Sequence, residues 1–296
     1  MRTASDKRWA FAGHALMLLL SFAALLPFAL LVISSFTSES AAVRNGYSLF
    51  PEAWSLNAYR YIAGRWDMIG RGYLVTFTVT LMGTAGSIIM SAMLGYVLSQ
   101  KDLPGRKALL FLVTFTMMFN GGLTATYIVY TQIFHIKNTI FGLLVPGLLM
   151  NGYNVMMFRN YFEMTIPAAL LESAKIDGAT ETKTFFKIVM PLSLPMVSTV
   201  GMMVALMYWN DWTNGLYYLS PSSRLQSIQT ILNNINENIK FLQSPELSST
   251  VIQNMELPST TVRMAVAVVG ILPILFLYPV MQRWFVRGMT VGAVKE

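Results

Sequence analysis

Residues Glu172–Pro195 read ESAKIDGATETKTFFKIVMPLSLP, and this stretch decides the fold of the chain. It is polar, it contains a single glycine, Gly178, and it lies between two segments that are apolar enough to cross a bilayer. A polar helix–glycine–helix element in that position has to lie at one membrane surface, where a soluble partner can bind it. We therefore predict an all-α polytopic membrane protein with a docking element on one face.

The composition of the whole chain favours insertion into a membrane. Of the 296 residues, 54% are hydrophobic and only 12% are charged, whereas a soluble domain carries about 25% charged residues. Six long runs contain no charged residue, and each is long enough to cross a hydrocarbon core, which takes about 20 helical residues. The buried helices of a soluble core would not give six such runs in so short a chain. We place six transmembrane helices at about residues 11–35, 73–99, 108–134, 139–160, 191–212 and 262–283, with the polar element at about 163–190.

Lysine and arginine residues indicate the orientation. Thirteen of the 21 lie in the two termini and in the connections on the same side as the termini. Since cytoplasmic connections are enriched in Lys and Arg, we expect both termini in the cytoplasm. The apolar stretch Phe11–Ile33 is longer than the 7–15 residues of a secretory signal core, so we expect a retained first helix. The chain has no cysteine, which excludes disulfides and thiolate metal sites.

Local sequence preferences predict the shape of the polar element. Pro167 suits the first turn of a helix. An apolar face at helical spacing includes Ala174, and Glu172 points to the opposite side. Gly178 can adopt the left-handed conformation that ends a helix, and Thr180 can cap a second short helix that stops before Pro191. We expect two short helices with a sharp bend between them.

The second predicted span carries small residues at a strict spacing of four, namely Gly83, Ser87, Ser91 and Gly95. Residues spaced by four lie on one helix face, and small side chains there let another backbone approach closely. We expect this face to pack against neighbouring helices.

The polar element resembles the EAA motif of ABC importer permeases. Glu172, Ser173, Ala174, Gly178, Ile188 and Pro191 hold the positions of the motif, and Asp177, Ala179, Phe185 and Pro195 also fit it. Ser173 and Met190 are small departures from the usual residues. The tail Gln282–Glu296 and the stretches Trp54–Tyr59 and Trp209–Leu219 resemble carbohydrate-importer permeases, and specifically the maltose-permease-like second subunit with six helices. The Trp-Asn-Asp-Trp sequence and Phe119–Tyr127 resemble the branch that handles oligosaccharides and polysaccharide fragments, including acidic ones such as alginate.

The resemblance implies a fold and a function. The chain, residues 1–296, would be a single permease domain of the type I ABC importer kind in a bacterial inner membrane, with no catalytic role of its own. Its partners would be a homologous second permease, two ATP-binding cassette ATPase subunits that bind ATP and Mg, an extracytoplasmic sugar-binding protein and the lipid bilayer, with no nucleic acid. The residues expected to couple it to an ATPase are Glu172, Ser173, Ala174, Asp177, Gly178, Ala179, Phe185, Ile188 and Pro191. No glycine is followed by lysine, so the chain lacks a Walker A loop and needs a separate ATPase.

A sugar pathway would need polar and aromatic side chains inside the membrane, where polarity is costly unless it faces a cavity. The candidates are Asn120, Tyr127, Asn151, Tyr153, Asn154, Trp209, Asn210, Asp211, Trp212 and Asn214. Each also has a structural interpretation: the asparagines can bond between helices, the tryptophans can anchor the chain at the membrane interface, and Asp211 can cap a helix.

Two other functional classes remain open from the sequence. A membrane-embedded glycan-modifying or lipid-modifying enzyme would need acids or histidines clustered at one membrane face, and only Asp211 lies within or beside a predicted span. An ion-coupled carrier is disfavoured because the chain lacks buried acids and inverted repeats.

Overall fold

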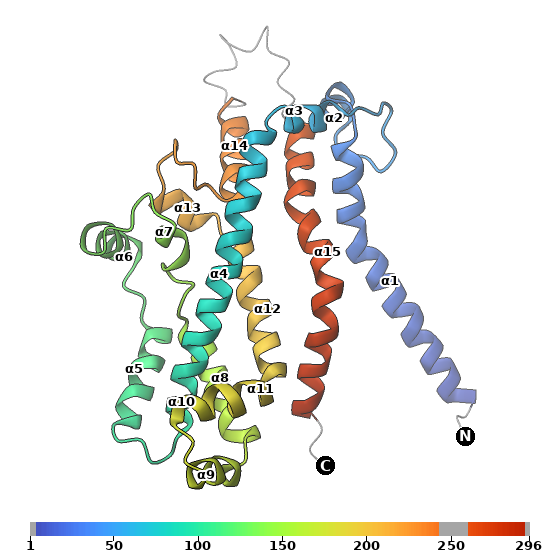
Figure 1. Ribbon diagram of the computed structural model, residues 1–296. Helices are drawn as coiled ribbons and strands as arrows, with labels where there is room; N and C mark the ends of the chain where they lie inside the picture. Colours follow the sequence, from blue (N-terminus) through green and yellow to red (C-terminus); the bar gives the residue numbers. More distant parts are fainter. Residues whose placement is uncertain (1–3, 243–259, 294–296) are drawn as a thin grey trace. The chain divides into compact units, whose positions relative to one another are not determined.

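The computed structural model of the chain describes residues 4–242 and 260–293 (Figure 1). Within these residues every regular element is a helix, apart from one isolated bridge between Thr37 and Trp54. The chain forms two compact units, Met1–Ile69 with Leu232–Pro273, and Gly70–Ile231 with Ile274–Glu296.

The first unit contains α1 (Ala4–Ser35), α2 (Glu39–Asn45), α3 (Asn57–Ala63) and the first part of α15 (Thr260–Ala293). Tyr59 of α3 stacks on Phe36 at 4.7 Å and shares a 2.8 Å hydrogen bond with the Ser35 hydroxyl, which holds α3 to the end of α1. The Glu39 carboxylate accepts hydrogen bonds from the backbone N–H groups of Thr260 and Thr261. It thereby satisfies two of the N–H groups that the first turn of a helix leaves without partners.

The second unit carries most of the elements. In chain order they are α4 (Trp66–Ser99), α5 (Arg106–Met118), α6 (Leu123–Ile128), the π-helix η1 (Val129–Ile133), α7 (Phe141–Leu144), α8 (Gly152–Thr165), α9 (Ala168–Ile176), α10 (Glu181–Thr184), the π-helix η2 (Phe185–Val189), α11 (Met190–Leu192), α12 (Leu194–Asn210), α13 (Thr213–Tyr218) and α14 (Ile228–Leu242). Helix α4 begins and α14 ends in the first unit.

Two single helices in the described part of the chain are long and apolar enough to cross a membrane, Trp9–Ser35 and Trp66–Ser99. Two further helix pairs meet the same criteria jointly, Arg106–Met118 with Leu123–Ile133 and Glu181–Leu192 with Leu194–Asn210. The first pair is bent by 113° and the second by 82°.

Three of the stretches predicted as continuous spans are therefore interrupted. Within 191–212 the helix breaks at Ser193, between α11 and α12. Within 108–134 the helix breaks at Asn120–Gly122, where Gly122 has a φ of +84° and its N–H donates to the Asn120 side chain at 2.9 Å. Within 139–160, α7 ends before Pro146 and Gly147, the latter with a φ of +71°, and α8 begins only at Gly152. These positive φ angles suit glycine and end a right-handed helix.

The core of the second unit lies between α4, α8 and α12. It includes Phe158, Phe162, Val200, Val204 and Tyr208. The small-residue face of α4 lies against this core, as predicted: Ser87 and Ser91 are fully buried, and a Cβ added at Gly83 would lie 2.3 Å from the Tyr208 ring. Small residues thus allow α4 to approach its neighbours closely.

Candidate functional site

The bent polar element is formed by α9, α10 and the turn between them. Gly178 has a φ of +73°, and the Thr180 side chain accepts a hydrogen bond from the Lys183 N–H at 3.3 Å as the cap of α10. Both features confirm the predictions from the sequence. They make the turn a defined joint between two helices.

The second helix does not stop before Pro191, which corrects the prediction. Residues Phe185–Val189 form a π-helical turn in which the Met190 N–H donates to the Phe185 carbonyl, and helical structure continues to Leu192. Proline has no N–H to donate. The wider turn before Pro191 lets the chain remain helical up to and through the proline.

The residues of the expected coupling set divide into an exposed and a buried group. Glu172, Ser173, Asp177, Gly178 and Pro191 are exposed, whereas Ala179 and Ile188 are partly buried. Ala174 and Phe185 are buried within the chain itself. The Ala174 side chain therefore holds α9 onto the rest of the unit and presents no surface to a partner in this geometry.

The carboxylate of Glu181, at the start of α10, contacts two other elements. The Tyr96 hydroxyl of α4 donates to Glu181 Oε2 at 2.8 Å, and Lys175 Nζ of α9 lies 3.2 Å from Oε1. The hydrogen bond from Tyr96 and the ion pair with Lys175 lower the pKa of Glu181, against a smaller opposing effect of burial. Glu181 is therefore ionised at neutral pH.

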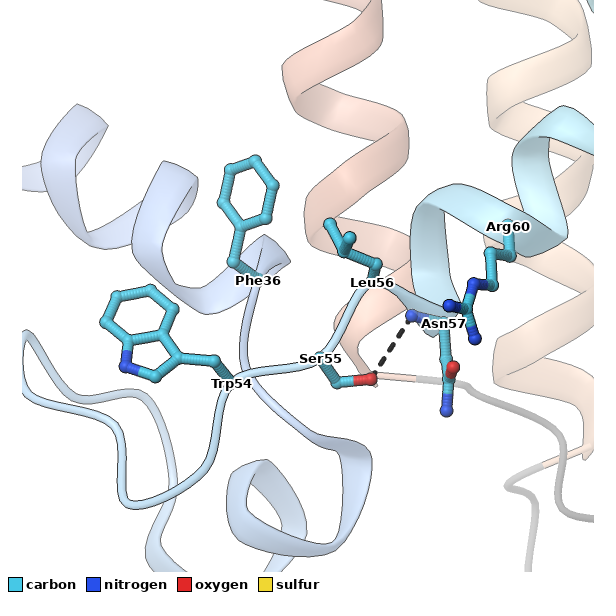
Figure 2. A pocket seen from close by; sticks show the side chains of 6 residues that line it. All are labelled: Phe36, Trp54, Ser55, Leu56, Asn57 and Arg60. Carbon is cyan, nitrogen blue, oxygen red and sulfur yellow. Dashed lines mark hydrogen bonds between the residues drawn. The ribbon is translucent and has the colours of Figure 1, made fainter.

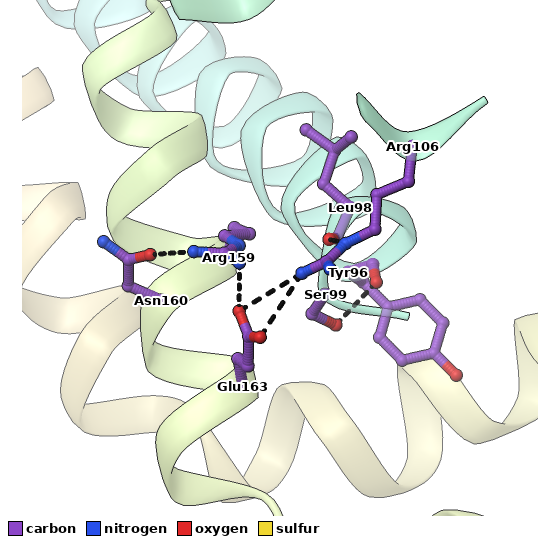
Figure 3. Close-up of polar contacts among 7 residues, drawn as sticks. All are labelled: Tyr96, Leu98, Ser99, Arg106, Arg159, Asn160 and Glu163. Atoms are coloured by element: carbon purple, nitrogen blue, oxygen red, sulfur yellow. Dashed lines mark hydrogen bonds and ion pairs between the residues drawn. The ribbon is translucent and has the colours of Figure 1, made fainter. Parts of the chain in front are cut away.

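A second carboxylate, Glu163 of α8, lies beside the same end of α4 (Figure 3). It pairs with Arg159 one turn earlier on α8 and with Arg106 Nη2 at 3.3 Å. Arg106 also donates from Nε to the Leu98 carbonyl at 2.8 Å. This bond satisfies one of the last carbonyls of α4, which have no partner within the helix. Glu163 and Arg106 thus join the ends of α4, α5 and α8.

Four of the ten sugar-pathway candidates have local structural roles. The side chains of Asn120 and Asn151 accept hydrogen bonds from the N–H groups two residues later, and Asp211 Oδ1 accepts from the N–H groups of Thr213 and Asn214. Asn210 donates to the Leu206 carbonyl of its own helix. These four side chains shape turns and helix ends, as the structural interpretation anticipated for Asp211.

The remaining candidates lie at several places. Asn214 is buried and donates to the Pro146 carbonyl at 3.0 Å, while Asn154 and Trp209 are also buried. Tyr127 stacks on Tyr218 at 6.0 Å. Tyr153 and Trp212 are exposed. Asn120 and Asn210 are exposed as well, so four of the ten candidates are accessible to a ligand, and two of these four are aromatic.

The structure adds a cation to the Tyr127 cluster that the sequence did not single out. Lys137 Nζ donates to the Tyr127 hydroxyl at 3.0 Å and lies 5.7 Å from the centre of its ring. Tyr130 packs edge-on against Tyr218 at 5.9 Å. A cation beside aromatic rings can bind an anionic group.

In the first unit, a pocket of about 450 Å³ lies between the end of α1 and the start of α3. Figure 2 shows the rings of Phe36 and Trp54 on one side of Leu56, with Asn57 and Arg60 on the other. Ser55 also lines the pocket and accepts a hydrogen bond from the Asn57 N–H at 3.2 Å. No group of three or more His, Cys, Asp or Glu side chains that could hold a metal occurs among the residues the structure describes.

Sequence reasoning did not single out the six residues of these networks as site residues: Tyr96, Arg106, Arg159, Glu163, Lys175 and Glu181. The spacing of Arg159 and Glu163 by four could have indicated an ion pair within one helix. The contact between Tyr96 and Glu181 joins residues 85 positions apart, and no local sequence pattern predicts it.

Comparison with known proteins identifies the family. Residues 87–291 match the model of the binding-protein-dependent transport system inner membrane component family. The chain belongs to this family of transport permeases.

Relatives of the permease include permease proteins of sugar transport systems. It is 36% identical over 282 residues to the polygalacturonan/rhamnogalacturonan transport system permease protein YtcP of Bacillus subtilis (strain 168), which covers 95% of this chain and 96% of the relative. It is 27% identical over 286 residues to the arabinooligosaccharides transport system permease protein AraQ of Halalkalibacterium halodurans, covering 93% of each chain.

Among solved structures, the permease resembles a chain from the crystal structure of a bacterial ABC transporter involved in the import of the acidic polysaccharide alginate. The TM-score is 0.78 at 26% identity, and the match covers 96% of this chain and 99% of the other. The predicted fold class, an all-α permease of the type I ABC importer kind, is thereby confirmed. The permease is a sugar ABC transporter subunit with no catalytic role, which decides against the enzyme and ion-coupled carrier alternatives.

Proposed function

We propose that this permease is one of two homologous subunits of an ATP-driven importer in a bacterial inner membrane, and that α9 docks on an ATPase subunit in the cytoplasm. The observation that supports this proposal is the exposed, glycine-jointed α9–α10 element, with Glu172, Ser173, Asp177 and Gly178 on its surface. Two ATPase subunits would bind ATP and Mg, an extracytoplasmic binding protein would deliver the sugar, and both termini would lie in the cytoplasm.

The permease itself makes and breaks no covalent bond. Its task is to present Glu172 to a basic partner residue and to convert movement of α9 into movement of the apolar helices. Because interiors are close-packed, helices shift as rigid bodies between discrete arrangements instead of deforming continuously. Closure of the ATPases would move the paired permeases from an inward-open to an outward-open state.

Charge reversal and steric substitution test the coupling. We expect Glu172→Lys and Gly178→Val to reduce sugar uptake by the reconstituted assembly at least tenfold while the permease still folds. The lysine would face a basic residue, and valine at a φ of +73° is strained by roughly 1–2 kcal/mol. Uptake, ATP hydrolysis and co-purification of the ATPase are the measurements.

Two matched controls lie in the first unit. Glu52→Lys reverses an exposed charge. Gly46→Val places valine at a φ of +73° and a ψ of −162°, which strains it at least as much as at Gly178, with no atom within 4 Å of the added Cβ. Both should transport normally. Normal uptake in Glu172→Lys and Gly178→Val would remove the coupling role from this element.

For the cargo, we propose oligosaccharides or polysaccharide fragments that carry carboxylates. Relatives named for polygalacturonan transport and for alginate import support this class. So do Lys137 beside Tyr127, and Arg60 in the aromatic pocket of the first unit, because guanidinium and ammonium groups bind carboxylates.

A pair of substrates that differ only in charge tests the cargo. We expect the complete assembly with its binding protein to take up oligogalacturonate at least tenfold faster than the fully methyl-esterified oligomer. Esterification keeps the sugar ring and removes the anion that the cations would bind. Equal uptake of both, or a preference for neutral arabino-oligosaccharides, would exclude the acidic class.

A further inference from the structure

The carboxylate of Glu181 joins the element that faces the partner to the long helix α4. Its two oxygens have different partners, Lys175 at the end of α9 and Tyr96 near the end of α4. In Figure 1, α9 and α10 lie beside that same end of α4. A single side chain therefore bridges three helices.

The bridge has a buried side and an exposed side. The Tyr96 ring is buried and packs against Phe162 at 6.3 Å and Phe185 at 5.4 Å, so its hydroxyl has a defined position. Lys175 and Glu181 flank the Gly178 joint, and their side chains are 55% and 60% exposed. An exposed ion pair contributes little by itself. The hydrogen bond from the buried tyrosine to an ionised carboxylate is the stronger contact.

The same end of α4 also contacts α5 and, through Arg106, α8. Arg106 binds the Leu98 carbonyl, and Glu163 binds Arg106 from α8. This contact makes α4, α5 and α8 one block at that end, while Glu181 connects the block to α9. Without Glu181, the contact that spans the Gly178 joint would be lost, and the buried Ala174 side chain would be left to hold α9 to the unit.

We propose that Glu181 is a positioning residue, which fastens α9 to α4 through Tyr96 so that displacement of α9 by a partner moves α4. The inference rests on the proposed function, because it assumes that α9 is the docked element. It assigns a transmission role to two side chains outside the EAA-like positions.

The test compares ATP hydrolysis with sugar uptake in the reconstituted assembly. Tyr96→Phe keeps the packed ring and removes only the hydroxyl that donates to Glu181. We expect the ATP hydrolysed per sugar imported to rise at least threefold, with the melting temperature of the assembly nearly unchanged. Glu181→Ala should behave alike, and Glu181→Gln, whose amide oxygen still accepts a hydrogen bond, should be intermediate.

A double variant distinguishes a loss of transmission through the Tyr96–Glu181 bond from a general loss of stability. If the two side chains act only through their mutual bond, Tyr96→Phe combined with Glu181→Ala should be no worse than either single change. Tyr59→Phe is the matched control, since it removes a tyrosine hydroxyl that bonds Ser35 in the first unit. It should leave the ratio of ATP to sugar unchanged.

The outcomes distinguish this inference from the proposed function. A wild-type ratio in both Tyr96→Phe and the exposed Glu181→Ala overturns the transmission role, as does a lower melting temperature at an unchanged ratio. If Glu172→Lys and Gly178→Val uncouple the assembly while these variants do not, docking of α9 stands and the fastening role fails. If none of the four variants uncouples, the proposed function itself fails.

Discussion

Gly95→Val is expected to destabilise the permease by about 3 kcal/mol, a cost at the upper end for overpacking. A Cβ at Gly95 would lie 2.8 Å from the Phe158 Cβ, 3.0 Å from the Arg159 backbone nitrogen and 3.1 Å from the Val155 carbonyl oxygen. Two of these neighbours are backbone atoms of α8, which no change of side-chain rotamer can move away. Helices α4 and α8 would have to separate, and the separation would also disturb the Glu163 contacts one turn further along α8.

Thermal unfolding followed by tryptophan fluorescence measures this effect, since the chain has six tryptophans and no cysteine for thiol-reactive dyes. Gly13→Val is the control, because a Cβ at Gly13 of α1 has no atom within 4 Å. We expect Gly13→Val to unfold at the wild-type temperature. Equal melting temperatures for Gly95→Val and the wild type would show that α4 and α8 are not in close contact.

Glu163→Gln is expected to cost about 2 kcal/mol, less than the roughly 3–5 kcal/mol for breaking a fully buried pair. The expected cost is lower than for a fully buried pair because the side chains of Glu163, Arg106 and Arg159 are 20–25% exposed. The change leaves two guanidinium groups near each other without the carboxylate between them. Arg106 would then be held less firmly at the Leu98 carbonyl, so the end of α4 should fray.

Two measurements check this prediction: a lower melting temperature, and faster hydrogen exchange over residues 95–110. The control is Glu237→Gln, which breaks the Lys240–Glu237 pair on α14, where both side chains are 56% exposed. Such pairs contribute about 0–1 kcal/mol. If both variants unfold at the same temperature, the Glu163 contacts contribute no more than a surface ion pair.

The two networks also bear on how movement spreads through the permease. Glu163 holds α4, α5 and α8 together, whereas Glu181 connects that block to the exposed α9. Loss of Glu163 should therefore act mainly on stability, and loss of the Tyr96–Glu181 bond mainly on coupling. Measuring both quantities on both sets of variants separates the two roles.

Local features of the site could be predicted from the sequence because neighbouring residues determine them. Gly178 adopts a positive φ that other residues rarely adopt, Thr180 caps the helix that follows it, and the small residues of α4 permit close packing. The helix breaks at Asn120–Gly122 and Pro146–Gly147 were not predicted from the local sequence. Their apolar sequence favoured continuous helices, although the glycines and the proline that interrupt them were visible.

By itself, the sequence determined the all-α membrane class, the family resemblance and the glycine-jointed element, since hydrophobic run length and backbone preference depend on residues close together in the chain. Only the tertiary structure decided that Ala174 faces inward, that Arg106 caps α4, and that Tyr96 donates to Glu181 85 residues away. The physical reason is that a polar side chain takes whichever partner the packing of the helices brings within about 3 Å. That packing is a property of the whole unit, and no local pattern of residues encodes it.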